Sequence, residues 1–326
     1  MKPMAAVAAL GLAFGAITTG DLHAATVFGS GANTFTIDFV EVGNAGNAND
    51  AGAGGGSYSS PYGGVNYNYR IGTHEISQEM ITRATASGLA NVTAGAHTGN
   101  EPAANISWYE AAAFVNWLNT STGHQAAYNL IFSGGWSMTL WGASDQASTG
   151  VDGGTNPYRH KDAFYFLPSE DEWYKAAYHQ NDGVTANYWD YALGSNTIPT
   201  AFASGTGAGT AVYNQSFATG PADITLAGGL SPYGTMGQNG NVWEWNESAF
   251  DGTNNASFED RAVRGGVWDL PEVNLRSSNR DFLGSPASEF VDVGFRVASV
   301  PEPSAALMMM MGLGALCLRR RSRPSL

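Results

Sequence analysis

The chain has almost no cysteine: among its 326 residues there is one, Cys317, close to the C-terminus. A single thiol cannot form an intramolecular disulfide. It also leaves the body of the chain, residues 26–299, without thiol catalysis and without a cysteine-based zinc site. Any chemistry in the body must therefore use oxygen or nitrogen side chains.

Charged residues are also scarce, at 13% of the chain, which is about half the share in a typical soluble domain. They are mostly acidic, with 15 Lys and Arg against 28 Asp and Glu. Five of the basic and two of the acidic residues lie outside 26–299, which leaves 10 basic and 26 acidic groups, a net charge of −16. Because such a surface repels phosphate backbones, no nucleic-acid partner is expected. Cations, neutral sugars and basic partners fit better.

Glycine, by contrast, is abundant at 42 residues, which favours loops and turns over a helical bundle or a coiled coil. Alternating apolar residues predict strands over 34–42 and 65–71. The Gly- and Asn-rich stretch 44–62 between them predicts a loop.

Three helices are predicted. One runs from near Ser77 to about Ala86, and two more begin at the capping boxes of Ser107 with Glu110 and of Ser169 with Glu172. After residue 181 the sequence predicts only short strands and long loops. Two or three helices beside many short strands indicate a single α+β domain.

Both ends of the chain have the composition of targeting segments. Residues 1–25 combine Lys2, an apolar run and a small-residue cleavage site, which predicts a secretory signal peptide; a buried N-terminal helix is the alternative. The last segment, 300–326, contains Pro301-Glu302-Pro303, an apolar run of 14 residues and the arginine cluster 319–323. A membrane-spanning helix ordinarily needs ~20 residues.

This C-terminal order resembles the PEP-CTERM sorting signal of Gram-negative bacteria. The resemblance implies export across the inner membrane, transient anchoring through the apolar transmembrane helix, and processing by an exosortase. The domain would then be at the cell surface or extracellular. An ordinary tail anchor is the alternative, and it too places the body outside the cytoplasm.

Four segments of the body carry a second resemblance. They are Tyr69–Ser77, Pro102–Asn119, Phe166–Ala177 and the group formed by Gly240–Trp245, Arg264–Trp268 and Val293–Val297. In this order they resemble the formylglycine-generating-enzyme family, also called the sulfatase-modifying-factor family, from about residue 69 to 298. The resemblance implies a loop-rich, C-type-lectin-like fold with short, mostly antiparallel strands.

Six residues of the last group form a structural motif. Large indoles bury much area, paired glycines allow close backbone approach, and arginines in a domain with few charges indicate internal ion pairs or capped carbonyls. These residues are Trp243, Trp245, Arg264, Gly265, Gly266 and Arg296.

The catalytic groups of the family are missing from the sequence. Its active oxidases use a cysteine pair to bind copper, expected here between Gly266 and Gly294, where the chain has none. Serine does not replace a thiolate as a soft copper ligand, so neither copper nor formylglycine-generating activity is expected. The related sulfoxide synthases use three iron-binding histidines on an added helical domain, which is absent. No two body histidines have ligand spacing.

A calcium site is a further prediction from the resemblance. The fold family often binds Ca²⁺ beside the Trp-Glu-Trp segment, where Gly240, Asn241, Val242 and Glu244 match part of the pattern. Gly237 stands where an acidic or amide ligand is expected, and Ca²⁺ requires six to eight oxygens. The loop 251–255 is a second oxygen-rich segment, and a simple turn explains it equally well.

The resemblance also places a substrate groove after Gly266. A flat aromatic face beside fixed polar groups is typical of sugar or peptide binding, although a solvated loop explains the composition as well. The predicted cleft residues are Trp268, Asp269, Asn279, Arg280 and Asp281. The sequence therefore predicts an exported binding module for a glycan or an extracellular protein. The alternative is an enzyme of the same superfamily that uses residues other than cysteine.

Overall fold

The computed structural model describes residues 24–52, 61–149, 154–282 and 284–301. The predicted signal peptide, except for its last two residues, and nearly all of the sorting segment lie outside these ranges. Ala24 and Ala25, the end of that predicted peptide, already belong to the first strand. Among the described residues no helix is both long enough and apolar enough to cross a membrane.

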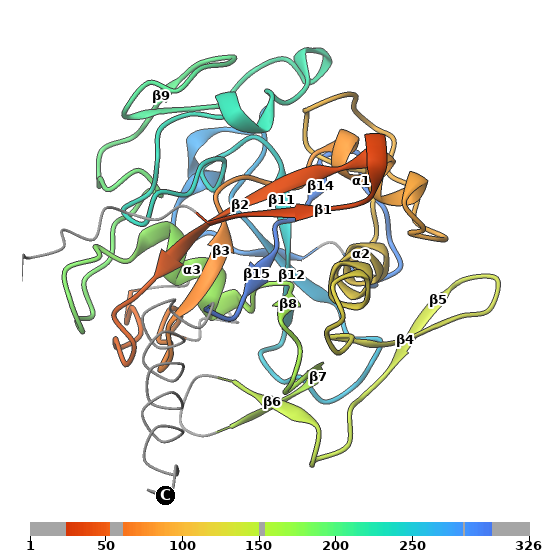
Figure 1. Cartoon of the computed structure of the whole chain (residues 1–326). Helices are drawn as coiled ribbons and strands as arrows, with labels where there is room; N and C mark the ends of the chain where they lie inside the picture. The colour runs from red at the N-terminus through yellow and green to blue at the C-terminus, as the bar shows by residue number, and fades with distance from the viewer. Residues whose placement is uncertain (1–23, 53–60, 150–153, 283, 302–326) are drawn as a thin grey trace, which may run out of the picture.

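The larger sheet has five strands in the order β1-β2-β3-β15-β8, and every neighbouring pair is antiparallel. Its strands are β1 (Ala24–Phe28), β2 (Phe35–Val42), β3 (Tyr69–Gly72), β15 (Ala298–Ser299) and β8 (Tyr165–Phe166). In Figure 1 the long β1–β2 pair crosses the front of the molecule. The sheet thus joins the first and last segments of the domain.

A four-stranded sheet in the order β13-β12-β11-β14 forms the second layer. Its strands are β11 (Trp243–Ala249), β12 (Arg261–Arg264), β13 (Asp281–Phe282) and β14 (Val293–Gly294). Strand β11 is antiparallel to β12 and parallel to β14. The Trp-Glu-Trp motif therefore begins β11, and the Arg-Gly-Gly motif starts at the last residue of β12.

Three two-stranded ribbons complete the strands of the described residues. The pairs β4–β5 and β6–β7 are antiparallel, whereas β9–β10 is parallel. Their bounds are β4 (Asn129–Phe132), β5 (Trp136–Thr139), β6 (Gln146–Ser148), β7 (Thr155–His160), β9 (Thr200–Ala201) and β10 (Thr210–Ala211). The β4–β5 hairpin projects from the body (Figure 1).

The three predicted helices are confirmed as α1 (Gln78–Ala86), α2 (Trp108–Ser121) and α3 (Glu170–Tyr178). Ser77 caps α1, and both predicted capping boxes are formed, so the side-chain oxygen of each N-cap serine accepts from the backbone N–H three residues later. The strand predicted over 65–71 is correct only for its end. Val65 is buried, but its carbonyl accepts from the Gly46 N–H in a loop contact, so it lies outside the ladder.

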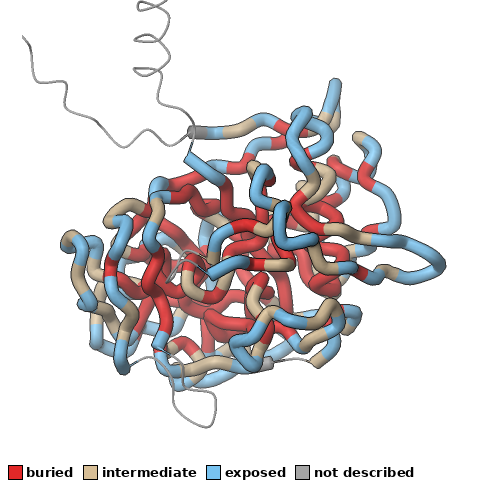
Figure 2. The backbone as a smooth tube through the Cα atoms, turned by 90° about the horizontal axis from the view of Figure 1, so that it is seen from below, coloured by how far each residue is buried: buried red, intermediate tan, exposed pale blue. Residues whose placement is uncertain are grey.

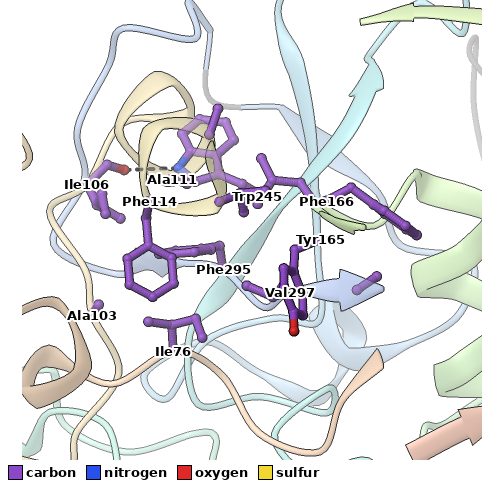
Figure 3. Close-up of a cluster of buried hydrophobic side chains, with 14 of the residues drawn as sticks. Ile76, Ala103, Ile106, Ala111, Phe114, Tyr165, Phe166, Trp245, Phe295 and Val297 are labelled. Atoms are coloured by element: carbon purple, nitrogen blue, oxygen red, sulfur yellow. Dashed lines mark hydrogen bonds between the residues drawn. The ribbon is translucent and has the colours of Figure 1, made fainter. Parts of the chain in front are cut away.

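The main core lies between the two sheets and α2, and buried segments run through the centre of the domain beneath an exposed shell (Figure 2). Phe114 of α2, Phe166 of β8, Trp245 of β11 and Phe295 meet there (Figure 3). The Trp245 indole N–H donates to the Ile106 carbonyl at 3.0 Å, which satisfies its polar atom inside the core. This core holds α3 and β11 in fixed relation, and those two elements carry most of the site described next.

Candidate functional site

Buried ion pairs form the centre of the domain. Arg159 of β7 lies between two carboxylates, 2.8 Å from Glu172 of α3 and 2.7 Å from Glu247 of β11. All three side chains are at most 6% exposed. Burial alone would raise the pKa of Glu172, but the charge and hydrogen bonds of Arg159 outweigh it and lower that pKa. Burial raises the pKa of Glu247 despite the same guanidinium, so Arg159 stabilises the charge of Glu172 more than that of Glu247.

The two motif arginines are bound in the same way. Arg264 of β12 is 2.7 Å from Glu170 of α3, and Arg296 is 2.5 Å from Glu244 of β11. Arg296 also donates to the carbonyls of Gly72 and Met236. With the Arg159 triad these pairs make up the ion-pair centre: Arg159, Arg264 and Arg296 with Glu170, Glu172, Glu244 and Glu247.

The other motif residues serve packing. Trp243 and Trp245 are buried in the main core. Gly265 and Gly266 have positive φ angles of 105° and 81°. A Cβ on Gly266 would lie 2.7 Å from the Leu275 side chain, so only glycine fits there.

The residues of the predicted calcium site already have protein partners. Arg296 and the Trp173 indole N–H together bind both carboxylate oxygens of Glu244. The amide of Asn241 accepts from the Ala222 N–H and donates to both oxygens of Glu75. Each side-chain oxygen of Glu244 and Asn241 thus already accepts at least one hydrogen bond, whereas Ca²⁺ requires six to eight oxygen ligands. The described residues contain no group of three or more His, Cys, Asp or Glu arranged to hold a metal ion. Calcium binding at these four residues stays a prediction, and calorimetric titration with calcium tests it.

Glu75 is a buried acid for which the sequence predicted no role. It lies over Gly237, where a Cβ would come within 2.8 Å of its carboxylate. Burial, and then the nearby charge of Glu244, raise its pKa well above the ordinary value. The only sequence signal was its place in the motif around His74, because the partner Asn241 is 166 residues away.

The predicted cleft residues fall into two sets of contacts. Trp268 is 1% exposed, and its ring packs against His97 and Phe217. Arg280 instead binds Glu170 at 2.7 Å. Asp269 and Asn279 are half-buried and Asp281 is exposed. None of the five lines any of the three described pockets.

A polar cleft of about 280 Å³ opens directly above the ion-pair centre. Its wall includes Glu170, the partner of Arg280, and Tyr62, whose ring lies 5.4 Å from the Arg280 guanidinium. Arg280 thus contacts two lining residues of the cleft without lining it itself. The lining is mostly neutral and polar: Asn49, Pro61, Tyr62, Tyr67, Ser148, Thr149, Asn156, Arg159, Ser169, Glu170, Asp171, Ser248, Gly252 and Asn254.

Hydrogen bonds hold the polar side chains of this cleft in place. Tyr67 donates its hydroxyl to Glu172 at 2.6 Å, and Asn156 donates to Glu247. Asn254, from the predicted oxygen-rich loop, accepts from the Ala249 N–H and donates to Asn156 at 3.3 Å. The amide of Asn254 keeps a second donor and acceptor position for a ligand.

Asp171 is the titratable group of the cleft. Its carboxylate accepts from the Gly63 N–H at 2.9 Å. Burial, followed by the charges of Glu170 and Glu172, raises its pKa from 3.8 to about 7. These three acids form the first turn of α3, where negative charge is favourable at the N-terminus of a helix. That Glu170 and Asp171 line a cleft depends on how α3 packs.

Comparisons with known proteins identify a family, a sorting motif and a fold. The PEP-CTERM protein-sorting motif matches residues 299–323, which indicates export and exosortase processing. Treponema denticola variable protein 1 is similar in structure, with a TM-score of 0.56 at 20% identity over 85% of this chain and 99% of its own. CarF is similar with a TM-score of 0.51 at 16% identity, over 82% and 99% of the two chains. No curated protein sequence matches the chain.

At these identities the structural likeness shows the fold alone, and it confirms the predicted loop-rich, C-type-lectin-like α+β fold. The sulfatase-modifying factor enzyme 1-like domain matches residues 30–300, which is most of the chain and includes every motif described above. The chain therefore belongs to the sulfatase-modifying factor enzyme 1-like family, and it carries a PEP-CTERM sorting motif behind that domain.

Proposed function

We propose that this exported protein is a binding module without formylglycine-generating activity, and that its polar cleft binds a neutral, hydroxyl-rich ligand, a glycan. The composition of the cleft carries this proposal. Asn49, Asn156 and Asn254 line it together with the rings of Tyr62 and Tyr67. Amides that donate and accept, beside aromatic faces, suit sugar hydroxyls and sugar rings.

The paired charges beneath the cleft support a neutral ligand. Arg159 also lines the cleft, but both its neighbours Glu172 and Glu247 hold it by hydrogen bonds. A ligand with a net charge would have to compete with these buried pairs, whereas hydroxyl groups need only the remaining amide positions.

The segment expected to carry the family's cysteines supports the loss of thiol chemistry. Between Gly266 and Gly294 the chain has no cysteine, and Leu275 and Ser277 are buried there. Arg276 lies over the ring of Tyr191. Leu275 and Ser277 therefore pack the domain at this place.

Glycan binding by the full mature chain tests the proposal. An array of bacterial polysaccharides identifies the ligand, and Asn254→Ala is expected to weaken its binding about tenfold, as loss of one or two hydrogen bonds would. Asn255→Ala is the matched control, since Asn255 is the exposed neighbour and does not line the cleft. Thermal unfolding checks that both variants fold, and Asn49→Ala replaces Asn254→Ala if the latter does not.

Two results would contradict the proposal. The first kind of result is a failed binding test: no glycan binds on the array, or Asn254→Ala and Asn255→Ala lose affinity equally. The second is conversion of a cysteine-containing sulfatase peptide to its aldehyde by the copper-treated protein, which would support the enzyme alternative.

Asp171 favours one second candidate, a hydrolase that acts on the bound glycan. A carboxyl group with a pKa near 7 is suited to general acid catalysis at neutral pH. Release of reducing ends from the array ligand, abolished in Asp171→Asn with binding retained, would support this candidate. Binding without turnover supports the binding module.

The sorting motif supports export of the protein, and we expect removal of the tail to release it to the cell surface or medium. Mass spectrometry of the secreted protein would show a C-terminus near residue 300. A mature chain that retains the arginine cluster 319–323 would instead indicate a permanent tail anchor.

A further inference from the structure

A second cavity lies away from the ion-pair centre and has a different composition. Its volume is about 510 Å³. It lies between the N-terminal turn of α2, the segment 91–93, the β4–β5 hairpin and the segment 287–289. We call it the amine pocket, defined by Tyr109, Glu110, Phe132, Trp136 and Glu289 among its lining.

Aromatic side chains form one wall of the amine pocket. Phe132 is 45% exposed, and its ring packs edge-on against Trp136 with centroids 5.0 Å apart. The Trp136 indole N–H donates to the Asn91 carbonyl at 2.8 Å, which ties the projecting hairpin of Figure 1 to the body. The hairpin thus holds two rings at a cavity where one of them remains open to a ligand.

Two carboxylates also belong to the lining. Glu110 belongs to the capping box of α2, is 4% exposed, and accepts from the backbone N–H groups of Thr93 and Ser107, both at 2.9 Å, and from the hydroxyl groups of the same two residues. These bonds fix its carboxylate in position. Glu289 is exposed and accepts from Asn105 at 3.3 Å. Burial, and then the charge of Glu110, raise the pKa of Glu289, so the two acids lie close enough to repel each other.

Among the residues that the structure describes, no basic side chain balances these two acids at the cavity. The lining contains no Lys, Arg or His. Arg261, whose charge reaches Tyr109, is fully buried against the rings of Trp108 and Tyr158 and does not line the pocket. An incoming positive charge would therefore be attracted by both carboxylates without displacing an existing ion pair.

We propose that the amine pocket binds a protonated primary amine carried on a short apolar stem or ring, as in an amino sugar or a lysine side chain. The ammonium group would lie at Glu289, which is exposed, with the fixed negative charge of the buried Glu110 beside it. Its carbon framework would pack on Phe132 and Trp136, where a cation also gains from the aromatic faces. A divalent metal fits less well, because two carboxylates beside an aromatic wall supply too few oxygens. This site is independent of the neutral ligand proposed for the polar cleft.

Paired probes test the requirement for the amine. The full chain is titrated with glucosamine and with N-acetylglucosamine, and separately with a lysine amide and its Nε-acetylated form. Calorimetry and tryptophan fluorescence report binding. Both amines are expected to bind, and both acetylated forms to bind at least tenfold more weakly. Tighter binding of glucosamine points to an amino-sugar ligand, and tighter binding of the lysine amide points to a basic protein; either supports the site.

Variants locate the binding in the pocket. Glu289→Gln and Phe132→Ala are each expected to weaken amine binding about fivefold. Glu41→Gln removes an equal charge from an exposed position on β2, and Ile131→Ala shortens the neighbouring exposed side chain on the same hairpin; neither residue lines the pocket. Absence of amine binding, equal binding of acetylated probes, or equal losses in the control variants would overturn the proposal. Because Glu110 caps α2, it is left unchanged in this test.

Discussion

The carboxylates of the ion-pair centre are paired with arginines, whereas those of the amine pocket have no basic residue beside them in the lining. In the centre, arginines from β7, β12 and the segment before β15 meet glutamates of α3 and β11, and their side chains are at most 6% exposed. In the pocket, Glu110 and Glu289 face a cavity whose lining has no basic residue. Both regions are acidic at the level of sequence, and they differ only in what the fold brings beside the acids.

The difference separates a structural use of charge from a binding use. A buried carboxylate needs a cation or several hydrogen bonds, since its desolvation costs several kcal/mol. In the centre the cations are arginines, and the resulting pairs hold distant segments in register. A carboxylate at an open cavity keeps part of its hydration and can exchange that water for a ligand. We therefore expect substitutions in the centre to change stability and substitutions in the pocket to change binding.

Breaking one pair in the centre should have the largest effect. Arg296→Met leaves Glu244 buried without its guanidinium, and we expect a loss of about 3–5 kcal/mol in the free energy of unfolding. Urea denaturation followed by tryptophan fluorescence measures it. The control is Arg83→Met, which breaks an exposed pair with Glu79 and should cost less than about 1 kcal/mol. Equal losses in the two variants would mean that the buried ion pair contributes no more to stability than the exposed one.

Asp171 is intermediate between the two regions and should make stability depend on pH. Its pKa is raised from 3.8 to about 7, so between these values the folded chain holds a proton that the unfolded chain has lost. The contribution of Asp171 to stability is therefore greatest below about pH 4 and declines as the pH rises towards 7.

Asp171→Asn should remove this slope and make the variant more stable than the wild type at pH 8 by roughly 2 kcal/mol, because the partial exposure of Asp171 reduces the full 1.36 kcal/mol per pKa unit. Denaturation curves at pH 4, 6 and 8 compare the two proteins. A constant difference across this range would mean that Asp171 titrates normally.

A lysine introduced into the amine pocket should have the smallest effect on stability and should block the binding of amines. Ala287 is exposed and lines the pocket, so Ala287→Lys places an ammonium group near Glu289. We expect a gain of about 0.5 kcal/mol and loss of glucosamine binding. Ala287→Gln has a similar length without the charge and should keep the binding. If the lysine variant binds amines as well as the glutamine variant, the carboxylates are not the binding groups.

Local signals explain why the helices could be predicted. Ser107 with Glu110 and Ser169 with Glu172 contact each other within one turn, so the sequence spacing itself contains the interaction. The strand predicted over 65–71 was too long because alternation describes a half-buried strand wherever it occurs, whereas Val65 is held by the neighbouring loop.

The absence of cysteine from the body, the acidic balance, the capped helices, the sorting motif and the family motifs were determined by the sequence alone. Each depends on composition or on residues a few positions apart. Only the tertiary structure decided which acid meets which arginine, since Glu244 and Arg296 are 52 positions apart and Glu170 and Arg264 are 94 apart. In the same way, the fold of the described residues brings no Lys, Arg or His into the lining of the pocket that contains Glu110 and Glu289. Charge pairing depends on distance in space, and the chain reaches those distances only after the core has packed.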